Sequence, residues 1–228
     1  MYETWDSSSS YSIKSGEDFK PSLTTYKIGN NVYSGILGLY ERGSSNEVNV
    51  IPLRGKYYPN VGDRVIGIVT KLQVFSWNVD INSFHEAVLP FSNAIKKGRT
   101  FYSDLSKLIS INDVIYAEIV SYDRFSPPTL SLRKKGLGKI TEGYLYEISP
   151  GKIPRVIGKN RSMINMLKQM LGIRIIVGKN GRIVALTQDY EKIAILGEII
   201  EKIETESHVP GLTDRVKNLL ESKLIKTS

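Results

Sequence analysis

The sequence of 228 residues contains no cysteine and only two histidines, His85 and His208, which lie far apart. The lack of cysteine excludes disulfide frameworks, thiolate zinc sites and a cysteine nucleophile, and two distant histidines leave little from which to build a catalytic triad or a metal site. No run of about 18 apolar residues occurs, and the first ten residues do not have the pattern of a signal peptide. We therefore expect a cytoplasmic protein with no membrane association and no cofactor or metal.

Positive charge is in excess and is unevenly distributed. The chain carries 31 basic and 23 acidic side chains, a net charge of +8. Between Lys152 and Arg182, eight basic residues occur without a single Asp or Glu. A run of one sign indicates a surface for a polyanion, because each Lys or Arg that neutralises a phosphate releases condensed counterions. A solvated face of the protein is the alternative that charge alone leaves open.

The fold class indicated by the pattern of the chain is multidomain, mainly β plus α+β. Short apolar runs separated by Gly, Asn and Ser turns give way, after a Gly-containing basic stretch, to segments of helical spacing. The expected parts are a flexible Ser-rich lead (1–22), an N-terminal β-hairpin domain (23–60), a five-stranded barrel (61–135), a linker (136–141), an α+β domain (142–207) and a C-terminal helical tail (208–228).

The barrel is predicted from five strand-like segments, which lie at 62–72, 74–81, 85–90, 113–122 and 129–133. Five strands with an insertion between the third and fourth are typical of the oligonucleotide-binding (OB) fold. The insertion is expected to contain a short helical turn near 103–109. Alternation in the second segment predicts an inward face with four members: Phe75, Trp77, Val79 and Ile81.

The α+β domain is predicted to have the order β-α-α-β-β-α. A strand at 144–149 precedes a helical pair whose apolar stripe is Met163, Ile164, Leu167, Met170 and Leu171, and Gly172 ends that helix. Strands at 173–177 and 182–187 follow. Asp189 is a predicted N-cap for a long helix with a buried stripe of Ile193, Leu196, Ile199, Ile200 and Ile203.

The segment Val-Ile-Gly-Lys-Asn-Arg-Ser-Met-Ile, residues 156–164, is the first candidate RNA site. A glycine at a junction of helices lets backbone amides approach a nucleic-acid backbone, and neighbouring cations add charge. It is similar to the clamp loop of a KH domain, Val-Ile-Gly-x-x-Gly-x-x-Ile, although Arg161 stands in place of the second glycine. The candidate RNA-binding residues here are Arg155, Gly158, Lys159, Asn160, Arg161 and Lys168. A plain turn between helices is the alternative reading of Gly158.

A second Gly-x-x-Gly string, residues 178–181, lies between two strands. Asn-Gly between β-branched runs is a strong hairpin signal. We therefore predict a structural turn formed by Gly178, Asn180 and Gly181 rather than an RNA clamp.

The barrel supplies the second candidate RNA site. Single-strand binders stack bases on aromatic rings and hold the backbone with cations. The aromatic candidates are Phe84, His85, Tyr122 and Phe125, and the basic candidates are Lys71, Lys96, Lys97, Arg99 and Arg124. Core packing is the expected role of Trp77, and His85 and the cluster at 96–99 have surface or solubilising roles as alternatives.

The barrel motifs GDRVIGIV, WNVDI, AVLP and DVIYAEIV before LSLR resemble an S1 domain. With the KH-like segment downstream, PLRGKYYP upstream and the closing GLTDRV, residues 24–220 resemble the S1/KH cap subunit of the archaeal RNA exosome. The resemblance implies a subunit that is not an enzyme, present in three copies on a hexameric ring of RNase PH-like proteins that degrades RNA by phosphorolysis. Such a cap binds single-stranded RNA and directs its 3′ end into the ring. The resemblance also implies a ring contact for the N-terminal domain and a place for the S1 domains around the pore entrance.

Two other functions stay open at this point. A nuclease would need carboxylates that hold Mg²⁺, but the spacing of the available acids, Asp80, Glu86, Asp104 and Asp123, singles out none of them. A translation-associated RNA binder would use the same two modules with ribosomal partners.

Overall fold

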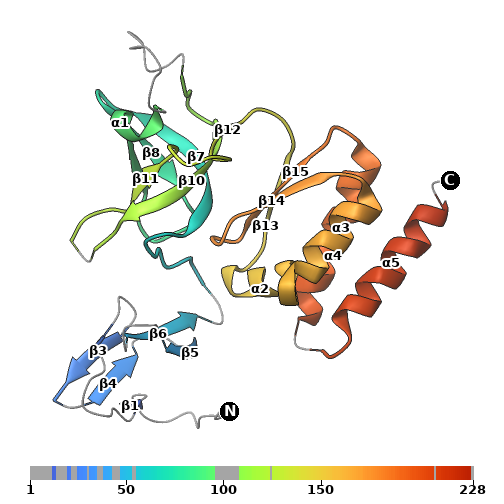
Figure 1. Cartoon of the computed structure of the whole chain (residues 1–228), viewed down its shortest axis with the longest axis horizontal. Helices are drawn as coiled ribbons and strands as arrows, with labels where there is room; N and C mark the ends of the chain where they lie inside the picture. Colours follow the sequence, from blue (N-terminus) through green and yellow to red (C-terminus); the bar gives the residue numbers. More distant parts are fainter. Residues whose placement is uncertain are drawn as a thin grey trace. The chain divides into compact units, whose positions relative to one another are not determined.

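The structure is a computed structural model. It describes residues 12–13, 20–21, 25–29, 31–34, 38–42, 47–52, 55–95, 108–123, 125–207 and 209–226. The chain divides into two compact units, Met1–Gly55 and Lys56–Ser228, each of which is considered by itself (Figure 1).

In the first unit, the described residues form two small three-stranded sheets. One has the order β1 (Ser12–Ile13), β4 (Asn31–Ser34), β3 (Thr25–Ile28), and the other the order β2 (Lys20–Pro21), β6 (Glu47–Pro52), β5 (Gly38–Arg42). The hairpin of β3 and β4 stacks Tyr26 on Tyr33, with ring centroids 5.7 Å apart. Residues 1–22 are expected from the sequence to be a flexible lead, but β1 and β2 within them pair with β4 and β6.

The second unit begins with the barrel. Its strands are β7 (Arg64–Leu72), β8 (Ser76–Asp80), β9 (Ala87–Pro90), β10 (Val114–Ser121), β11 (Thr129–Ser131) and β12 (Gly138–Ile140), and α1 (Phe91–Ala94) follows β9. The sheet order is β11-β9-β8-β7-β10-β12, and β11 also pairs with β10, which closes the barrel. The predicted five-stranded OB barrel is confirmed. Strand β12, which pairs with β10, lies in the stretch that the sequence predicts as a linker.

Inward-pointing side chains of the barrel strands form its core. Trp77, Val79 and Ile81 are fully buried, as predicted, and the indole N–H of Trp77 donates to the carbonyl of Ile109 at 3.0 Å. The prediction for Phe75 is wrong, because its side chain is 77% exposed. Phe75 precedes β8 and lies in the turn from β7, where the alternation of the strand no longer applies. Of the predicted helical turn at 103–109, residues 103–107 lie outside the described residues, and Leu108 and Ile109 are not helical.

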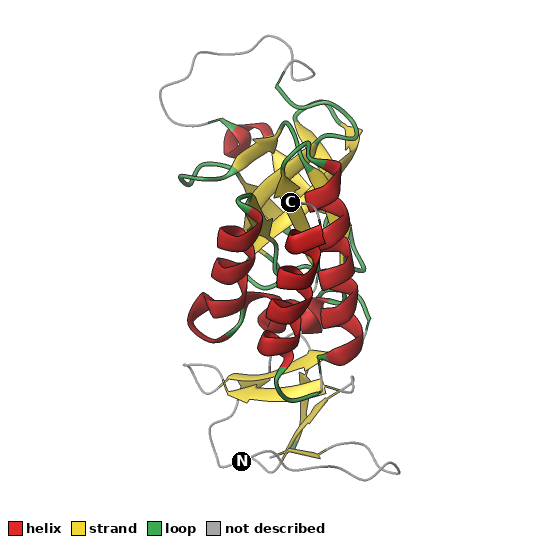
Figure 2. Ribbon diagram, turned by 90° about the vertical axis from the view of Figure 1, so that its right-hand side faces the viewer, coloured by secondary structure: helices red, strands yellow, loops and turns green. Residues whose placement is uncertain are grey.

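The remainder of the second unit has the predicted β-α-α-β-β-α order of a KH fold. Its elements are β13 (Tyr144–Glu147), the 3₁₀ turn η2 (Pro150–Lys152), α2 (Ile153–Ile157), the 3₁₀ turn η3 (Lys159–Arg161), α3 (Ser162–Leu171), β14 (Arg174–Val177), β15 (Arg182–Leu186), α4 (Tyr190–Glu206) and α5 (Leu212–Lys226). The sheet order is β13-β15-β14. Helices α3, α4 and α5 lie side by side (Figure 2).

Local signals set the helix boundaries. Asp189 accepts hydrogen bonds from the backbone N–H groups of Glu191 and Lys192, so the predicted N-cap of α4 is confirmed. The buried stripe of α4 contains Ile195 rather than the predicted Ile193, which is only partly buried. Helix α5 shares the KH core through Leu212, Val216 and Leu220.

Candidate nucleic-acid interface

Connected polar side chains lie on the outer face of β7 and β8 and on the segments beside them. We call this set the polar ladder: Thr70 of β7, Gln73 in the turn, Ser76 and Asn78 of β8, and Glu86 directly before β9. Thr70 and Asn78 each donate to a different oxygen of Glu86, both at 2.9 Å. Gln73 donates to Asn78 at 2.9 Å, and Ser76 donates to Gln73 at 3.3 Å. In OB folds, oligonucleotides bind to the face of strands 2 and 3 and to the loop between strands 1 and 2. In this barrel β8 is the second strand, and residues 73–75 form the loop between the first and second strands. The ladder therefore offers ordered, at least partly exposed hydrogen-bonding groups where a single strand of nucleic acid is expected.

The turn between β7 and β8 presents an exposed aromatic ring at the end of this ladder. Phe75 is 77% exposed and Val74 is 78% exposed. The turn is closed by a hydrogen bond of 2.8 Å from the Gln73 N–H to the Ser76 carbonyl, and the Phe75 carbonyl accepts from the Phe91 N–H at 3.0 Å. Phe75 was missed as a candidate in the sequence because it continues the alternation of β8. The predicted candidate Lys71 is exposed and lies opposite Asn78 in the strand register.

Aromatic candidates gather at the other end of the barrel. Phe84 packs edge-on against Tyr58, with ring centroids 5.2 Å apart, and Tyr122 is half-buried against the barrel core. Burial, with smaller contributions from Tyr58 and Asp123, raises the pKa of Tyr122, which places these groups near one another. Tyr58 is a further member of this aromatic group that the sequence patterns did not single out. The pair of tyrosines at 57 and 58 was the available signal for an aromatic cluster. His85 is exposed, without a resolved aromatic contact in the part of the chain that the structure describes.

Phe125 is 97% exposed on a loop that is held by Asp123. One oxygen of Asp123 accepts from the N–H groups of Phe125 and Ser126 at 2.8 and 2.7 Å, and these hydrogen bonds lower the pKa of the carboxyl. The basic candidates Lys96, Lys97, Arg99 and Arg124 lie outside the described residues.

The clamp loop of the KH domain is Gly158–Arg161. Gly158 has φ of +73°, and a Cβ on it would lie 2.7 Å from the backbone nitrogen of Met163, so only glycine fits. Asn160 and Arg161 have φ of 51° and 63°, the left-handed region. Arg161 thus adopts the conformation that a glycine favours at this position of the KH pattern. Residues 159–161 and the neighbouring Arg155 are exposed, and Lys168 is half-buried on α3.

The basic run from Lys152 to Arg182 is not one continuous surface. Arg182 is 4% exposed and is bonded to the carboxylates of Asp80 and Glu147. Lys152 donates to the Ser207 hydroxyl, and Lys179 pairs with Asp63 at 2.6 Å. The members that remain exposed without an ion pair in the described structure are Arg155, Lys159, Arg161 and Arg174.

The predicted turn of Gly178, Asn180 and Gly181 joins β14 to β15 and contacts the barrel. Asn180 is fully buried: its amide donates to the carbonyls of Ile66 and Ile81 at 2.7 and 2.9 Å and accepts from the Ile66 N–H at 3.1 Å. A Cβ on Gly178 would lie 2.8 Å from the nitrogen of Ile66. We call these contacts, with those of Lys179 and Arg182, the seam.

Charged groups complete the seam. Arg182 donates to the Asp80 carbonyl at 2.6 Å and to its carboxylate. Burial disfavours the ionised form of Asp80, but hydrogen bonds from Arg182 and the Asn82 N–H, with the charges of Arg182 and Lys56, outweigh burial and lower the pKa of Asp80. Burial and the neighbouring Asp63 raise the pKa of Tyr57, whose hydroxyl donates to Asp63 at 2.6 Å.

Family models match both modules of the second unit. The model described as RRP4, S1 domain matches residues 56–121, and that described as KH domain matches residues 143–183. The exosome complex component Rrp4 of Thermofilum pendens is 42% identical over 208 residues, covering 90% of this chain and 88% of the relative. The chain belongs to the Rrp4 family.

Other members of the Rrp4 family show the same extent of similarity. The exosome complex component Rrp4 of Sulfurisphaera tokodaii is 41% identical, covering 89% of this chain and 82% of the relative, and that of Nitrosopumilus maritimus is 36% identical, covering 90% and 91%. A crystal structure assigned to an exosome complex RNA-binding protein superposes with a TM-score of 0.69 at 35% identity, covering 76% of this chain and 99% of that chain. The S1/KH resemblance indicated by the sequence motifs is confirmed.

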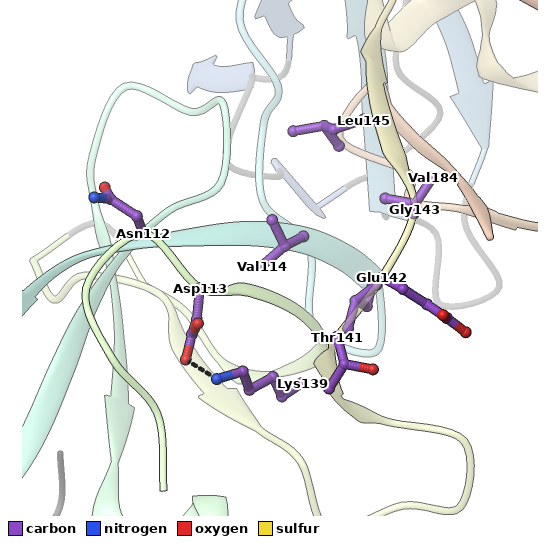
Figure 3. A pocket seen from close by; sticks show the side chains of 10 residues that line it. Asn112, Asp113, Val114, Lys139, Thr141, Glu142, Gly143, Leu145 and Val184 are labelled. Atoms are coloured by element: carbon purple, nitrogen blue, oxygen red, sulfur yellow. Dashed lines mark ion pairs between the residues drawn. The ribbon is translucent and has the colours of Figure 1, made fainter. Parts of the chain in front are cut away.

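A hollow of about 450 Å³ lies between the S1 and KH domains of this Rrp4-family chain (Figure 3). Val114, Leu145 and Val184 line its apolar part, and Asp113 pairs with Lys139 at 2.6 Å. Because these two charges neutralise each other, the hollow is less suited to phosphate than the clamp loop. Among the described residues no group of three His, Asp or Glu side chains is placed to hold a metal ion, and no helix there is long and apolar enough to cross a bilayer.

Proposed function

We propose that this chain is a non-catalytic RNA-binding subunit of a cytoplasmic exosome complex. It captures single-stranded RNA and directs the 3′ end into a phosphorolytic ring, on which three copies sit. The S1 domain (61–135) and the KH domain (142–207) are the RNA-binding parts. The observation that carries the proposal is the S1 face formed by the ladder and Phe75. Asn78 of the ladder lies on β8, the second strand of the barrel, and the exposed ring of Phe75 lies in the loop between the first and second strands, two parts that bind oligonucleotides in OB folds.

The clamp loop of the KH domain supports the same function. Its left-handed residues and its glycine give the backbone shape that clamps a few nucleotides, and Lys159 and Arg161 add charge. The relatives that this chain resembles are named as exosome components, which favours the exosome over ribosomal partners.

RNA binding is tested by the affinity for a single-stranded oligoadenylate and for duplex DNA over a range of salt concentrations. We expect preference for the single strand and an affinity that falls as salt rises, because phosphate contacts release counterions. Equal affinity for both nucleic acids, or no dependence on salt, contradicts the proposal.

The role in the complex is tested by reconstitution with ring subunits of RNase PH type. The protein alone, incubated with labelled RNA, phosphate and Mg²⁺, is expected to leave the RNA intact. Added to the ring, it is expected to increase RNA capture and degradation, with three copies per ring by native mass spectrometry. Shortening of RNA by the protein alone, or co-purification with ribosomal subunits in place of ring proteins, contradicts the proposal.

A further inference from the structure

The polar ladder of the S1 domain extends directly to the KH domain. Side chains alternate along a strand, so Asn78 and Asp80 of β8 share the outer face at a spacing of about 7 Å. Asn78 belongs to the ladder, and Asp80 binds Arg182 of the KH domain. The polar ladder and the contact between the two domains therefore lie at neighbouring outward positions of β8.

The seam holds the two domains in one arrangement. The buried amide of Asn180 makes three hydrogen bonds to the backbone of β7 and of the residue after β8. The Asn82 side chain donates back to the Asn180 carbonyl at 3.1 Å. Paired polar groups in a buried site favour one geometry, because any shift leaves donors and acceptors unsatisfied.

The same turn supports the segment that leads to the clamp loop. The Ile148 N–H donates to the Gly181 carbonyl at 2.8 Å, and a Cβ on Gly181 would lie 2.2 Å from the Ile148 carbonyl oxygen. From Ile148 the chain continues through η2 and α2 into Gly158–Arg161. On the S1 side, Asn82 at the seam is two residues from the exposed Phe84. The turn at 178–181 thus contacts Asn82 in the S1 loop after β8 and Ile148, which directly precedes the segment leading to α2.

Arg64 places an exposed cation beside the seam, where an RNA strand that binds both domains would pass. Arg64 shares the outer face of β7 with Ile66, which Asn180 covers. The Arg64 side chain is exposed, and no ion pair or side-chain hydrogen bond engages it within the described residues, while its carbonyl accepts from the Lys179 N–H at 2.9 Å. A guanidinium in this place is suited to a phosphate.

We propose, on the basis of the function proposed above, that the seam is a positioning element for RNA. Asn180 and Arg182 hold the S1 face and the KH clamp loop so that one RNA strand engages both at once, and Arg64 contacts the phosphates between them. Engaging the second site then becomes intramolecular, which raises the affinity for a strand long enough to reach both sites without changing the affinity for a short one.

The first experiment compares oligoadenylates of about five and about twenty nucleotides, which fit one site or span both. Asn180→Ala is expected to bind the short RNA as the unchanged protein does and the long RNA at least about tenfold more weakly. Arg64→Ala is expected to weaken only the long RNA. Leu220→Ala is the matched control, because it removes a buried side chain of α5 from the KH core and Leu220 takes no part in the hydrogen bonds and ion pairs of the seam. It is expected to leave the ratio of the two affinities unchanged.

The second experiment measures how firmly the seam fixes the distance between the S1 and KH domains. The chain has no cysteine, so Lys135→Cys and Glu201→Cys, at exposed sites on S1 and KH, give a unique pair of spin labels. The distance distribution is expected to be narrow and to broaden on Asn180→Ala but not on Leu220→Ala.

The outcomes separate the two proposals. If the unchanged protein binds neither RNA, the proposed function fails. If it binds both and Asn180→Ala keeps the full affinity for the long RNA, the positioning role is overturned, whether or not the distances broaden. An equal loss for the short and the long RNA also overturns it.

Discussion

Phe75 and Gly158 are two residues of the proposed RNA surface whose surroundings make opposite demands on the side chain. An aromatic ring in a tight turn contributes little to folding when it is exposed to water, yet the turn around Phe75 is fixed by two backbone hydrogen bonds. At Gly158, by contrast, no side chain fits, because a Cβ there would collide with the backbone of Met163.

Replacing Phe75 with alanine is expected to weaken the binding of single-stranded RNA by about 1 to 3 kcal/mol, the contribution of one base stacked on a ring. The free energy of unfolding should change little, because the side chain is largely exposed. Fluorescence anisotropy with labelled RNA and urea denaturation measure the two quantities. Val74→Ala, at an equally exposed neighbour, is the control and should preserve the affinity; a loss of stability without a loss of affinity contradicts the role.

Gly158→Ala is expected to lower the free energy of unfolding by about 1 to 3 kcal/mol, because the new Cβ collides with the backbone of Met163 at a positive φ. Gly172→Ala provides a comparison: its φ is also positive, at 62°, but no atom lies within 4 Å of a Cβ there. The cost at Gly172 should be the smaller of the two in urea denaturation. Equal costs would show that crowding at Gly158 is unimportant.

At the scale of elements, the KH domain makes two sets of contacts that its β-α-α-β-β-α order does not include. Helix α5 completes its core, and the turn between β14 and β15 anchors it to β7 and β8. The order of strands and helices was predictable because alternation and helical spacing repeat over many residues. The participation of α5 in the KH core was not, because an amphipathic pattern identifies a buried face but not its partner.

Leu220→Ala is expected to reduce the free energy of unfolding by about 2 to 5 kcal/mol, since the side chain is fully buried. Urea denaturation followed by circular dichroism of the helices measures the change. Lys217→Ala, on the exposed side of the same helix, should cost less than about 0.5 kcal/mol. If both variants cost equally little, α5 is not part of the core.

The ion pair of Asp80 and Arg182 predicts a pH dependence. The pKa of Asp80 is lower in the folded chain than in the unfolded chain, so the unfolded state binds more protons. Its contribution to stability is therefore fully present above about pH 4, the usual range of an Asp side chain, and is lost as pH falls through the lowered pKa. We expect Asp80→Asn to be destabilising at pH 7 and progressively less destabilising as the pH falls below about 4, measured by urea midpoints. A penalty that stays constant with pH contradicts this assignment.

At the scale of the whole molecule, the S1 and KH domains form one compact unit, and buried polar side chains connect them. The net charge of +8 favours association with a polyanion in general. We expect the exposed cations without an ion pair, rather than the total charge, to determine where phosphates bind.

Residues 56–228 are expected to unfold in one cooperative transition, because the seam couples the S1 and KH cores. Fluorescence of Trp77, in the S1 core, and circular dichroism of the KH helices should give coincident urea curves. Asn180→Ala should separate the two curves. Curves that are already separate in the unchanged protein would show that the seam is too weak to couple the domains.

Sequence patterns by themselves determined the two folds, the N-cap at Asp189, the turn at 178–181 and the family motifs. These depend on neighbours along the chain, where alternation, capping and turn chemistry act over a few residues. Only the tertiary structure decided that Phe75 is exposed, that Arg182 is buried between two carboxylates and that Asn180 binds the barrel. Each of these outcomes depends on groups that are distant in sequence, such as Ile66 and Asn180, and the burial and pairing of a side chain follow from which surfaces meet.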